Sequence, residues 1–584
     1  MATRHNLMLV LGTVLLLLFA CKQGKFTGDK YKLTTNRGTL AKKAMVVTAH
    51  PEASKVGLQI LQQGGNAIDA AIAVQYALAV VYPIAGNLGG GGFMVYRSKD
   101  GKTDCLDFRE EAPQKAHKDL YLDSLGKVIP RLSLDGHLAV GVPGTVDGTI
   151  KAHEKYGKLP FSKLVQPAID LAEKGFRIAE RQAEALNKYQ DDIKKMNTAP
   201  TVFYKADKWQ PNDVLIQADL AQTLTLIKEQ GRAGFYEGAT ANKLVNEMKK
   251  GKGIIGYDDL KNYTSVWREA ITGNYKNYRL ISMPPPSSGG IALVQLCKMI
   301  APYPIASWGH NEAQTIHHIV EAERRVYADR ATHLGDPDFY KVPINGLLDD
   351  RYLNFRMRDF KTDRASETRK IRAGQPKGAI IKPSEATKPK EGEQTTHFSI
   401  VDAQGNAVSV TTTLNAAYGS KVVVTTAGFL LNNEMDDFSA KPGVPNLYGL
   451  VGNEANAIAP GKRMLSSMTP TIVEKDGELF MVLGTPGGST IITSVLQTFL
   501  NVVAHNMGMQ ESVNAKRFHH QWKPDTVFVE QNALSNATAN TLQEMKHTLV
   551  ERKPIGRVDA ILVLPDGSLE GGADNRGDDT ALGY

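Results

Sequence analysis

Hydrophobic and polar positions change their period along the chain. Apolar runs near the start predict a strand at residues 45–51, a helix at 53–61, a second helix at 67–81 and a strand at 93–96, with Gly and Pro between them. Helical patterns dominate from about residue 164 to residue 326. Strands and helices therefore alternate in the first part of the chain, as in an α/β protein.

The pattern becomes strand-like after residue 394. Residues 395–401 and 407–414 alternate on either side of the turn-forming residues 402–406, which predicts a β-hairpin. A further strand is predicted at 479–483 and a helix at 491–504. The stretch before the hairpin, residues 361–394, has few large apolar residues and predicts a polar linker that does not order itself.

The N-terminus has the pattern of an export signal. Arg4 precedes an apolar run at residues 7–20, which is shorter than the ~20 residues that span a membrane as a helix. Leu18-Phe19-Ala20-Cys21 resembles a bacterial lipobox. We therefore expect residues 1–20 to be removed, Cys21 to carry lipid, and the protein to lie in the periplasm or on the cell surface. The alternative is an ordinary cleaved signal followed by an incidental cysteine.

Charge and cysteine content exclude several classes of protein. The net charge is +8, from +14 before residue 395 and −6 from residue 395 onward. The basic residues are dispersed and no nucleic-acid motif accompanies them, so opposite charge between two associating segments is the simpler interpretation. Cys105 and Cys297 have apolar neighbours and are expected in the core. The His pairs at 317–318 and 519–520 lack zinc-site spacing, so no metal is expected.

Two features point to chemistry, each with a structural alternative. The Gly-rich loop at residues 484–490 lacks the Lys of a P-loop, and residues 89–92 lack dinucleotide-binding spacing. Two backbone N–H groups at such a turn can form an oxyanion hole, although tight turns have the same composition. Thr395 lies where the linker meets a strand. Cutting the Gln394–Thr395 bond would create an N-terminal threonine that carries its own base, but linker-to-strand junctions are common.

Residues 394–402 resemble the processing site of the γ-glutamyltransferases, which belong to the N-terminal-nucleophile hydrolase superfamily. The resemblance extends from residue 44 to residue 584. Other segments that resemble the family are residues 107–110, 284–290, 430–439, 465–470, 484–489 and 517–522.

The resemblance implies a fold and a maturation. It implies a four-layer αββα sandwich, formed jointly by a large subunit (residues 21–394) and a small catalytic subunit (residues 395–584). The precursor would cut itself once, after Gln394, and the two chains would remain together as a heterodimer.

The resemblance also implies roles for individual residues. Thr395 is the nucleophile, Thr413 orients it, Gly487 and Gly488 form the oxyanion hole, and Tyr448 closes a lid. Arg109 offers a planar fork to the donor α-carboxylate. The implied donor-binding residues are Arg109, Thr413, Asn415, Glu434, Asp437, Ser466, Ser467 and Gly488.

The implied activity needs no cofactor. A γ-glutamyl donor such as glutathione would acylate Thr395, and water, an amino acid or a peptide would accept the acyl group. The nearest rival is a β-lactam side-chain (glutaryl) acylase of the same fold, which has no α-ammonium to bind; Asn415, Glu434 and Asp437 argue against it. A non-catalytic binding lipoprotein is the other rival, and the intact Thr395 argues against that.

Overall fold

Two antiparallel sheets of seven strands each form the centre of the protein in this computed structural model, which describes residues 37–380 and 395–584. The predicted signal at 1–20, Cys21 and Gln394 lie outside the described residues. The first sheet has the order β1 (Thr39–Ala41), β18 (Leu569–Ala573), β17 (Asp559–Val563), β13 (Glu478–Gly484), β12 (Thr471–Lys475), β9 (Tyr278–Ser282) and β8 (Ile271–Tyr275). The second has the order β19 (Thr580–Gly583), β2 (Met45–Thr48), β10 (Thr396–Val401), β11 (Ala407–Thr413), β3 (Gly91–Arg97), β4 (Thr103–Phe108) and β7 (Val266–Arg268).

Each sheet combines strands from both sides of the predicted cleavage point. The β10–β11 hairpin lies between β2 and β3, with Phe398 opposite Thr48 and Thr411 opposite Phe93. In the other sheet, β12 pairs with β9, and β18 pairs with β1. Neither segment therefore forms a complete sheet without the other.

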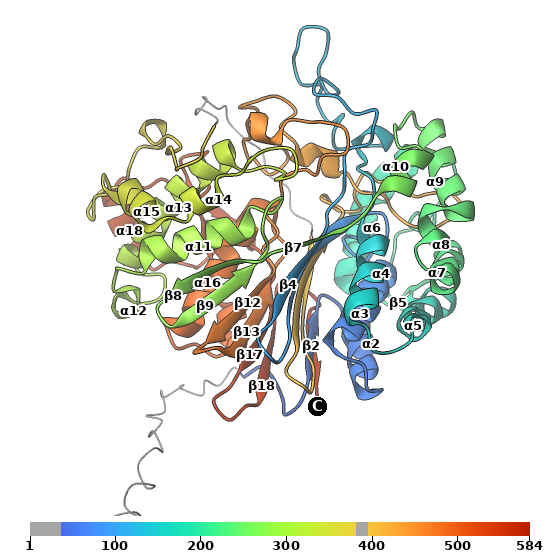
Figure 1. Cartoon of the computed structure of the whole chain (residues 1–584), viewed down its shortest axis with the longest axis horizontal. Helices are drawn as coiled ribbons and strands as arrows, with labels where there is room; N and C mark the ends of the chain where they lie inside the picture. Colours follow the sequence, from blue (N-terminus) through green and yellow to red (C-terminus); the bar gives the residue numbers. More distant parts are fainter. Residues whose placement is uncertain (1–36, 381–394) are drawn as a thin grey trace, which may run out of the picture. The chain divides into compact units, whose positions relative to one another are not determined.

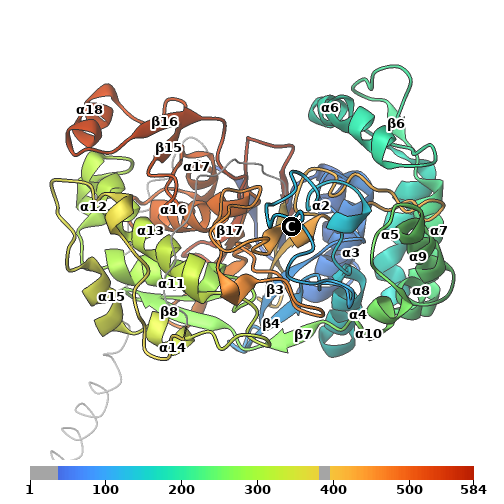
Figure 2. The ribbon, with the colours of Figure 1, turned by 90° about the horizontal axis from the view of Figure 1, so that it is seen from above.

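The sheets stack face to face between two layers of helices (Figures 1 and 2). An apolar cluster between the sheets includes Val47 and Phe93 from one sheet and Ile472 and Val482 from the other. Helices before residue 263 cover the second sheet, and later helices cover the first. The first group is α2 (Pro51–Gln62), α3 (Ala67–Val81), α4 (Thr145–Tyr156), α5 (Phe161–Lys174), α6 (Glu180–Met196), α7 (Ala218–Gln230), α8 (Ala233–Tyr236), α9 (Gly238–Lys250) and α10 (Tyr257–Asn262). The second group is α11 (Gly289–Ile300), α12 (Ile305–Trp308), α13 (Ala313–His333), α14 (Ile344–Leu347), α15 (Asp350–Met357), α16 (Ile491–Val503), α17 (Met509–Asn514) and α18 (Asn536–Glu544).

Smaller elements complete the fold. A three-stranded sheet and a two-stranded sheet lie outside the main sheets, and short 3₁₀ turns connect longer elements. The small strands are β14 (Phe518–His519), β15 (Val527–Glu530), β16 (Leu549–Arg552), β5 (Phe176–Arg177) and β6 (Val214–Leu215). The 3₁₀ turns are η1 (His137–Ala139), η2 (Thr368–Lys370), η3 (Glu434–Asp437), η4 (Glu454–Asn456) and η5 (Gly488–Thr490).

The local predictions around the hairpin and α3 are confirmed. Asn66 and Asp69 form a capping box at the start of α3, which ends at Val81 as its pattern predicts. Asp402 organises the hairpin turn by accepting from the N–H groups of Gln404 (2.9 Å) and Asn406 (3.0 Å). Its other oxygen accepts from Ala67 N–H at 2.9 Å, so the hairpin turn is tied to the start of α3.

Two predictions need correction. Strands β7, β8 and β9 interrupt the stretch predicted as helical, because β7 pairs with β4 and the β8–β9 hairpin pairs with β12, and both partners are distant in sequence. Residues 361–380, the described part of the predicted linker, are packed in place. Trp522 Nε1 donates to Ile371 O at 3.0 Å, and Thr368 N–H donates to Asp525 at 2.8 Å. Polar contacts hold this segment, and a count of apolar residues does not reveal them.

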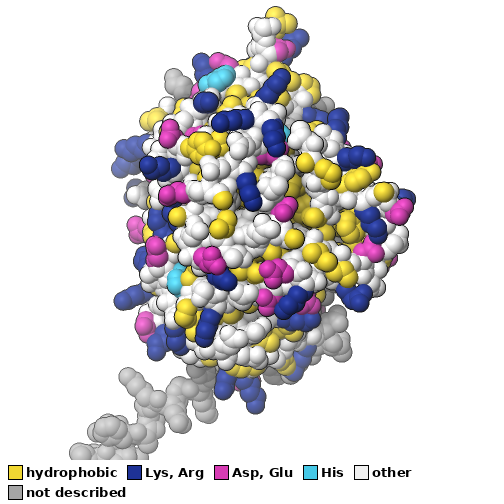
Figure 3. Space-filling model, turned by 90° about the vertical axis from the view of Figure 1, so that its right-hand side faces the viewer, with side chains coloured by type: hydrophobic (Ala, Val, Ile, Leu, Met, Phe, Trp, Pro, Cys, Tyr) yellow, Lys and Arg dark blue, Asp and Glu magenta, His cyan; other side chains and the backbone are white. Residues whose placement is uncertain are grey.

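The outer surface carries mixed charge. On the face shown in Figure 3, Lys and Arg are scattered among acidic and apolar side chains and form no continuous basic stripe. Over residues 37–380 and 395–584, no helix is long and apolar enough to cross a bilayer, and no three His, Cys, Asp or Glu side chains group as metal ligands would. Cys105 and Cys297 are buried and unpaired, as predicted.

Candidate active site

One small cavity gathers almost all the residues that the resemblance implied. It lies where β10 begins, β11 ends, and three loops meet. Among the described residues, Gly487 is the one predicted catalytic, donor-binding or lid residue that does not line it. The predicted residues in its wall are Arg109, Thr395, Thr413, Asn415, Glu434, Asp437, Tyr448, Ser466, Ser467 and Gly488. Arg330, Leu450, Met468 and Ile491 also line it and were not predicted.

The hairpin places two threonine hydroxyls together. Thr395 directly precedes β10, Thr413 ends β11, and their Oγ1 atoms are 3.4 Å apart. The neighbouring residues Thr396 and Thr412 are partners in the ladder, so sheet pairing sets this approach. Thr413 Oγ1 also accepts from Asn415 N–H at 2.7 Å. Thr395 is only 4% exposed, so its hydroxyl sits in a site that excludes bulk water.

The Gly-rich turn presents backbone to the same cavity. Gly487 and Gly488 both have positive φ, 140° and 54°. A Cβ at position 488 would lie 2.2 Å from Tyr448 Cδ1, so only glycine fits there. Helix α16 begins at Ile491, and the positive end of its dipole lies at this turn. Together these features favour negative charge beside Thr395.

The opposite wall is densely charged. Arg109 follows β4, and its guanidinium contacts Glu434 Oε2 at 2.7 Å and Asp437 Oδ2 at 2.6 Å. Both carboxylates belong to the 3₁₀ turn η3. Glu110 Oε2 lies 3.5 Å from the same guanidinium, and Arg109 Nε donates to Met464 O at 3.3 Å.

Burial governs the protonation of this cluster. Desolvation raises the pKa of Glu434 well above its ordinary value, against the attraction of Arg109. The pKa of Asp437 is raised for the same reason, and that of Glu110 rises to about 7. The three carboxylates outnumber the single guanidinium they surround, so each disfavours ionisation of the others.

The structure adds internal partners to the role predicted for Arg109. Its fork was expected to face a donor carboxylate, with Glu434 and Asp437 reserved for an ammonium group. In the structure these opposite charges pair with each other. The cavity volume is about 20 Å³, roughly the space of one water molecule. A donor must therefore enter by taking the place of these internal contacts.

The loop over the cavity is tied to the charged wall. Tyr448 OH donates to Asn415 O at 2.5 Å. Asn446 Nδ2 donates to Asp437 Oδ1 at 3.0 Å, while its Oδ1 accepts from the N–H groups of Tyr448 and Leu450. Asn446, which the sequence analysis did not single out, thus connects this loop to one of the carboxylates.

Arg330 is the most significant residue missed by sequence reasoning. It lies in α13, where nearly every side chain from Thr315 onward is buried whether charged or apolar. A periodicity analysis assigns charged helix positions to solvent, so it gave no indication that Arg330 faces the cavity. Only the three-dimensional packing reveals it.

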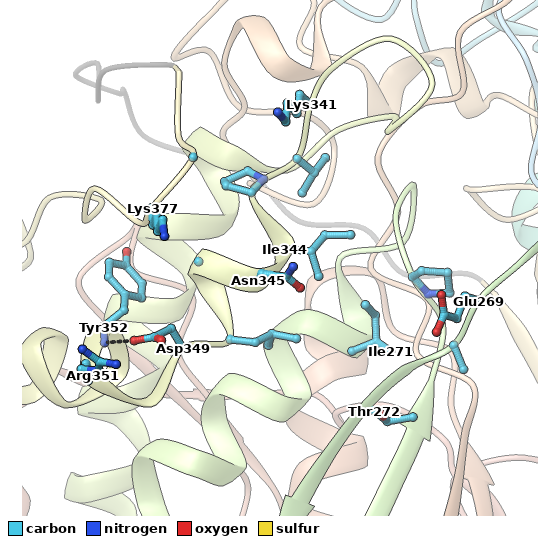
Figure 4. Close-up of a pocket in the computed structure, with 17 residues that line it drawn as sticks. Glu269, Ile271, Thr272, Lys341, Ile344, Asn345, Asp349, Arg351, Tyr352 and Lys377 are labelled. Atoms are coloured by element: carbon cyan, nitrogen blue, oxygen red, sulfur yellow. Dashed lines mark hydrogen bonds between the residues drawn. The ribbon is translucent and has the colours of Figure 1, made fainter.

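A much larger cavity lies elsewhere. Its volume is about 1060 Å³, and it is bounded by β8 and the short helices α14 and α15 (Figure 4). Its charged side chains, which include Glu269, Lys341, Asp349 and Arg351, are of both signs. Asp349 there accepts from Tyr352 N–H at 3.0 Å and caps α15. None of the predicted site residues lines it.

The fold and the site define an α/β protein of two stacked sheets, with a buried threonine hydroxyl beside a cluster of buried charges. The family model described as Gamma-glutamyltranspeptidase matches residues 53–584, and the chain belongs to that family. A glutathione hydrolase proenzyme from Escherichia coli (strain K12) is 45% identical over 547 residues, 93% of this chain and 92% of the relative. An Acylase ACY 1 proenzyme from Pseudomonas sp. (strain V22) is 35% identical over 95% of both chains. The crystal structure of a cephalosporin acylase from Bacillus halodurans matches with a TM-score of 0.81 and 26% identity, over 96% of this chain and 99% of that one.

Proposed function

We propose that this protein is a self-cleaving γ-glutamyltransferase that hydrolyses glutathione and transfers its γ-glutamyl group. The observation that carries the proposal is the Arg109–Glu434–Asp437 cluster beside the Thr395 hydroxyl in one cavity. The family assignment and the similarity to the glutathione hydrolase proenzyme support the same activity.

The charged wall suits a zwitterion. A γ-glutamyl donor carries an α-ammonium and an α-carboxylate on one carbon. The ammonium replaces Arg109 as partner of Glu434 and Asp437, and the carboxylate replaces those acids as partner of Arg109. Asn415 accepts from the ammonium, and the Ser466 and Ser467 hydroxyls donate to the carboxylate. The exchange adds no net charge to a buried site, so its desolvation cost is smaller than that of a singly charged donor.

Maturation and turnover use the same hydroxyl. In the precursor, Thr395 Oγ1 attacks the Gln394 carbonyl carbon, the C–N bond breaks, and the amide nitrogen takes the proton. Water then hydrolyses the ester and leaves Thr395 with a free amine. In turnover this amine takes the hydroxyl proton as Oγ1 attacks the γ-carbonyl, and passes it to the departing amine. Gly487 and Gly488 N–H groups donate to the oxyanion, and Thr413 keeps the hydroxyl in line.

The acyl-enzyme has two fates. Water releases glutamate, and the amine of an amino acid or peptide gives a new γ-glutamyl amide; either restores the Thr395 hydroxyl. We propose that the large subunit (residues 21–394) and the small subunit (395–584) remain a heterodimer. The interleaved strands of both sheets support this, because separation would break ladders throughout the core. We propose, as the family resemblance implies, that the fold is of the N-terminal-nucleophile hydrolase type.

A glutaryl acylase is the second candidate, favoured by the likeness to the cephalosporin acylase structure. A glutaryl chain keeps the carboxylate but lacks the ammonium that Glu434 and Asp437 would bind. Release of aniline from a γ-glutamyl anilide, compared with a glutaryl anilide, distinguishes the two. We expect strong preference for the γ-glutamyl compound, and a preference for the glutaryl compound would overturn the proposal.

The location is a separate proposal. Because Leu18 to Cys21 resemble a lipobox, we propose that Cys21 is lipidated and anchors an exported protein to a membrane surface. Cys21→Ser should release the protein from membranes or leave its signal in place. Mass spectrometry of the mature N-terminal peptide tests this, and an unmodified Cys21 in a membrane-extracted sample would contradict it.

A further inference from the structure

Arg330 is a buried cation at the wall of the active-site cavity. Its side chain comes from α13 and is 5% exposed. Nε donates to Ser288 Oγ at 2.9 Å, and Nη2 donates to Ser467 Oγ at 3.0 Å. No carboxylate among the described residues lies within ion-pair distance of it, in contrast to Arg109. A buried guanidinium whose bonds go to hydroxyls keeps its full charge available.

The serines it contacts belong to one connected group. Ser288 N–H and Oγ both donate to Ser466 O, at 2.8 Å and 2.6 Å. Arg330 thus holds Ser467 directly and braces the backbone of Ser466 through Ser288. These two serines are the hydroxyl donors assigned above to the donor α-carboxylate.

The charges around the cavity indicate a role for Arg330 in binding the donor α-carboxylate. Glu110, Glu434 and Asp437 surround Arg109, so an incoming carboxylate meets a guanidinium that three carboxyl groups already contact. Burial lowers the pKa of Arg330 to about 10, and the negative charge of Asp437 opposes that decrease. The group therefore remains cationic at neutral pH and is the second positive charge at this cavity.

We propose that Arg330 determines specificity for the donor α-carboxylate, by its positive charge and by fixing the Ser467 hydroxyl. The inference rests on the proposed function. Binding of the donor α-carboxylate needs a positive charge, and Arg109, which three carboxyl groups already contact, does not supply it alone. Arg330 acts at the recognition end of the donor and has no part in cutting the Gln394–Thr395 bond.

A neighbouring residue on α13 provides a contrast. Tyr327, one helical turn earlier, donates from its OH to Ser489 O at 2.6 Å and so braces the turn that follows Gly488. Loss of this bond acts on the oxyanion end, which every acyl donor uses. Its effect should not depend on whether the donor has a carboxylate.

Three anilides separate these roles. The γ-glutamyl anilide has carboxylate and ammonium, the glutaryl anilide has the carboxylate alone, and the 4-aminobutyryl anilide has the ammonium alone. kcat/KM is measured for each, or the competitive inhibition constant where turnover is too slow. Arg330→Gln should weaken the two carboxylate-bearing compounds about 30- to 100-fold and the 4-aminobutyryl compound by less than about 5-fold.

Matched variants sharpen the result. Arg330→Lys keeps the charge and should recover about 10-fold of the loss for the carboxylate-bearing compounds. Tyr327→Phe should weaken all three compounds equally. Arg325→Lys, a buried arginine of the same helix paired with Glu321, should leave the ratio among the three unchanged. Ser467→Ala should shift the preference in the same direction as Arg330→Gln, and it tests the inference even where Arg330→Gln fails to fold.

Two outcomes would overturn the inference. An equal loss for all three compounds in Arg330→Gln would reduce Arg330 to a structural role, and unchanged preference in Ser467→Ala would remove the serine connection. The wild type and the appearance of two chains on a gel test the proposed function separately. A wild type that cuts itself and prefers the γ-glutamyl anilide upholds that function whatever Arg330 does.

Discussion

The two sides of the active-site cavity are built on opposite principles. The side of the proposed nucleophile, called the nucleophile side below, includes Thr395, Thr413 and Gly488. It carries no charged side chain and is positioned by strand pairing and a helix start. The recognition side, with Arg109 and Glu434, consists of buried charges that contact one another.

The nucleophile side depends mainly on the exact positions of its groups, and the recognition side depends mainly on charge. On the nucleophile side, a displacement of a hydroxyl by about 1 Å is costly, because reaction depends on a near-attack distance. On the recognition side, side chains must exchange partners when a donor enters, so charge matters more than a fixed position. Changes on the first side should abolish chemistry, and changes on the second should alter selectivity and affinity.

The largest effect is expected for the nucleophile. Thr395→Ala should give one uncut chain with no transferase or hydrolase activity, because the same hydroxyl is needed for both steps. Thr395→Ser keeps the hydroxyl and should cut more slowly, since the lost methyl group no longer restricts χ1. Intact mass and N-terminal sequencing check both. A small chain that begins elsewhere, or activity in an uncut chain, would contradict the comparison.

A large but incomplete loss is expected on the recognition side. Arg109→Lys removes a planar fork that contacts two carboxylates, and kcat/KM for a γ-glutamyl donor should fall roughly 30- to 1000-fold. Self-cleavage should persist, because the precursor bond presents no α-carboxylate to Arg109. Arg131→Lys is the control, since that arginine pairs with Asp135 on the exposed surface. Near-normal kcat/KM in Arg109→Lys would show that the carboxylate binds elsewhere.

A smaller effect concerns stability and pH. Burial raises the pKa of Glu110 from 4.5 to about 7, so the folded protein binds more protons than the unfolded chain between these values. The contribution of Glu110 to the free energy of unfolding is thus fully present below pH 4.5 and is lost as pH rises toward 7. Glu110→Gln should remove this slope and raise stability at pH 8 by roughly 1–3 kcal/mol.

Urea unfolding from pH 5 to 8 measures this slope best in the uncut Thr395→Ala chain, where unfolding stays intramolecular. Glu544→Gln, at an exposed position on α18, serves as the control. Parallel pH profiles for Glu110→Gln and its parent would show that Glu110 is ionised throughout.

The smallest effect is expected at the loop over the cavity. Tyr448→Phe removes the hydrogen bond from its OH to Asn415 O and should raise KM for the donor roughly 3- to 10-fold with little change in kcat. Steady-state kinetics give KM and kcat for this variant. Tyr257→Phe, at a partly exposed tyrosine on α10, is the control. A fall in kcat with unchanged KM would assign Tyr448 to the nucleophile side instead.

Sequence reasoning succeeded where local pattern and motif carry the information. The bounds of α3 follow from its apolar run between Gly and Pro residues, and the β10–β11 hairpin follows from alternation around a turn. Ten of the site residues were named in advance through resemblance, and they meet in one cavity. Periodicity alone did not bring Arg109 and Glu434 together, because they are separated by more than 300 positions.

The failures have a common physical origin. Strand β9 was missed because, beyond its hairpin with β8, it pairs with β12, which is distant in sequence. Thr368 and Ile371 were assigned to an unordered linker, yet polar contacts to Asp525 and Trp522 hold them. Arg330 was missed because a charged residue in a helix is expected in water. In each case the stabilising partner is remote in sequence.

The interleaving of strands has a consequence for the lifetime of the protein. Before the proposed cut, β10 and β11 find β2 and β3 as parts of one molecule, so bringing them together costs loop-closure entropy and no entropy of association. After the cut, any global unfolding separates two chains that must meet again in solution, at a rate that depends on their concentration. Recovery of the cut protein after unfolding therefore falls with dilution, whereas that of the precursor does not, so slow unfolding contributes more to the lifetime of the cut protein.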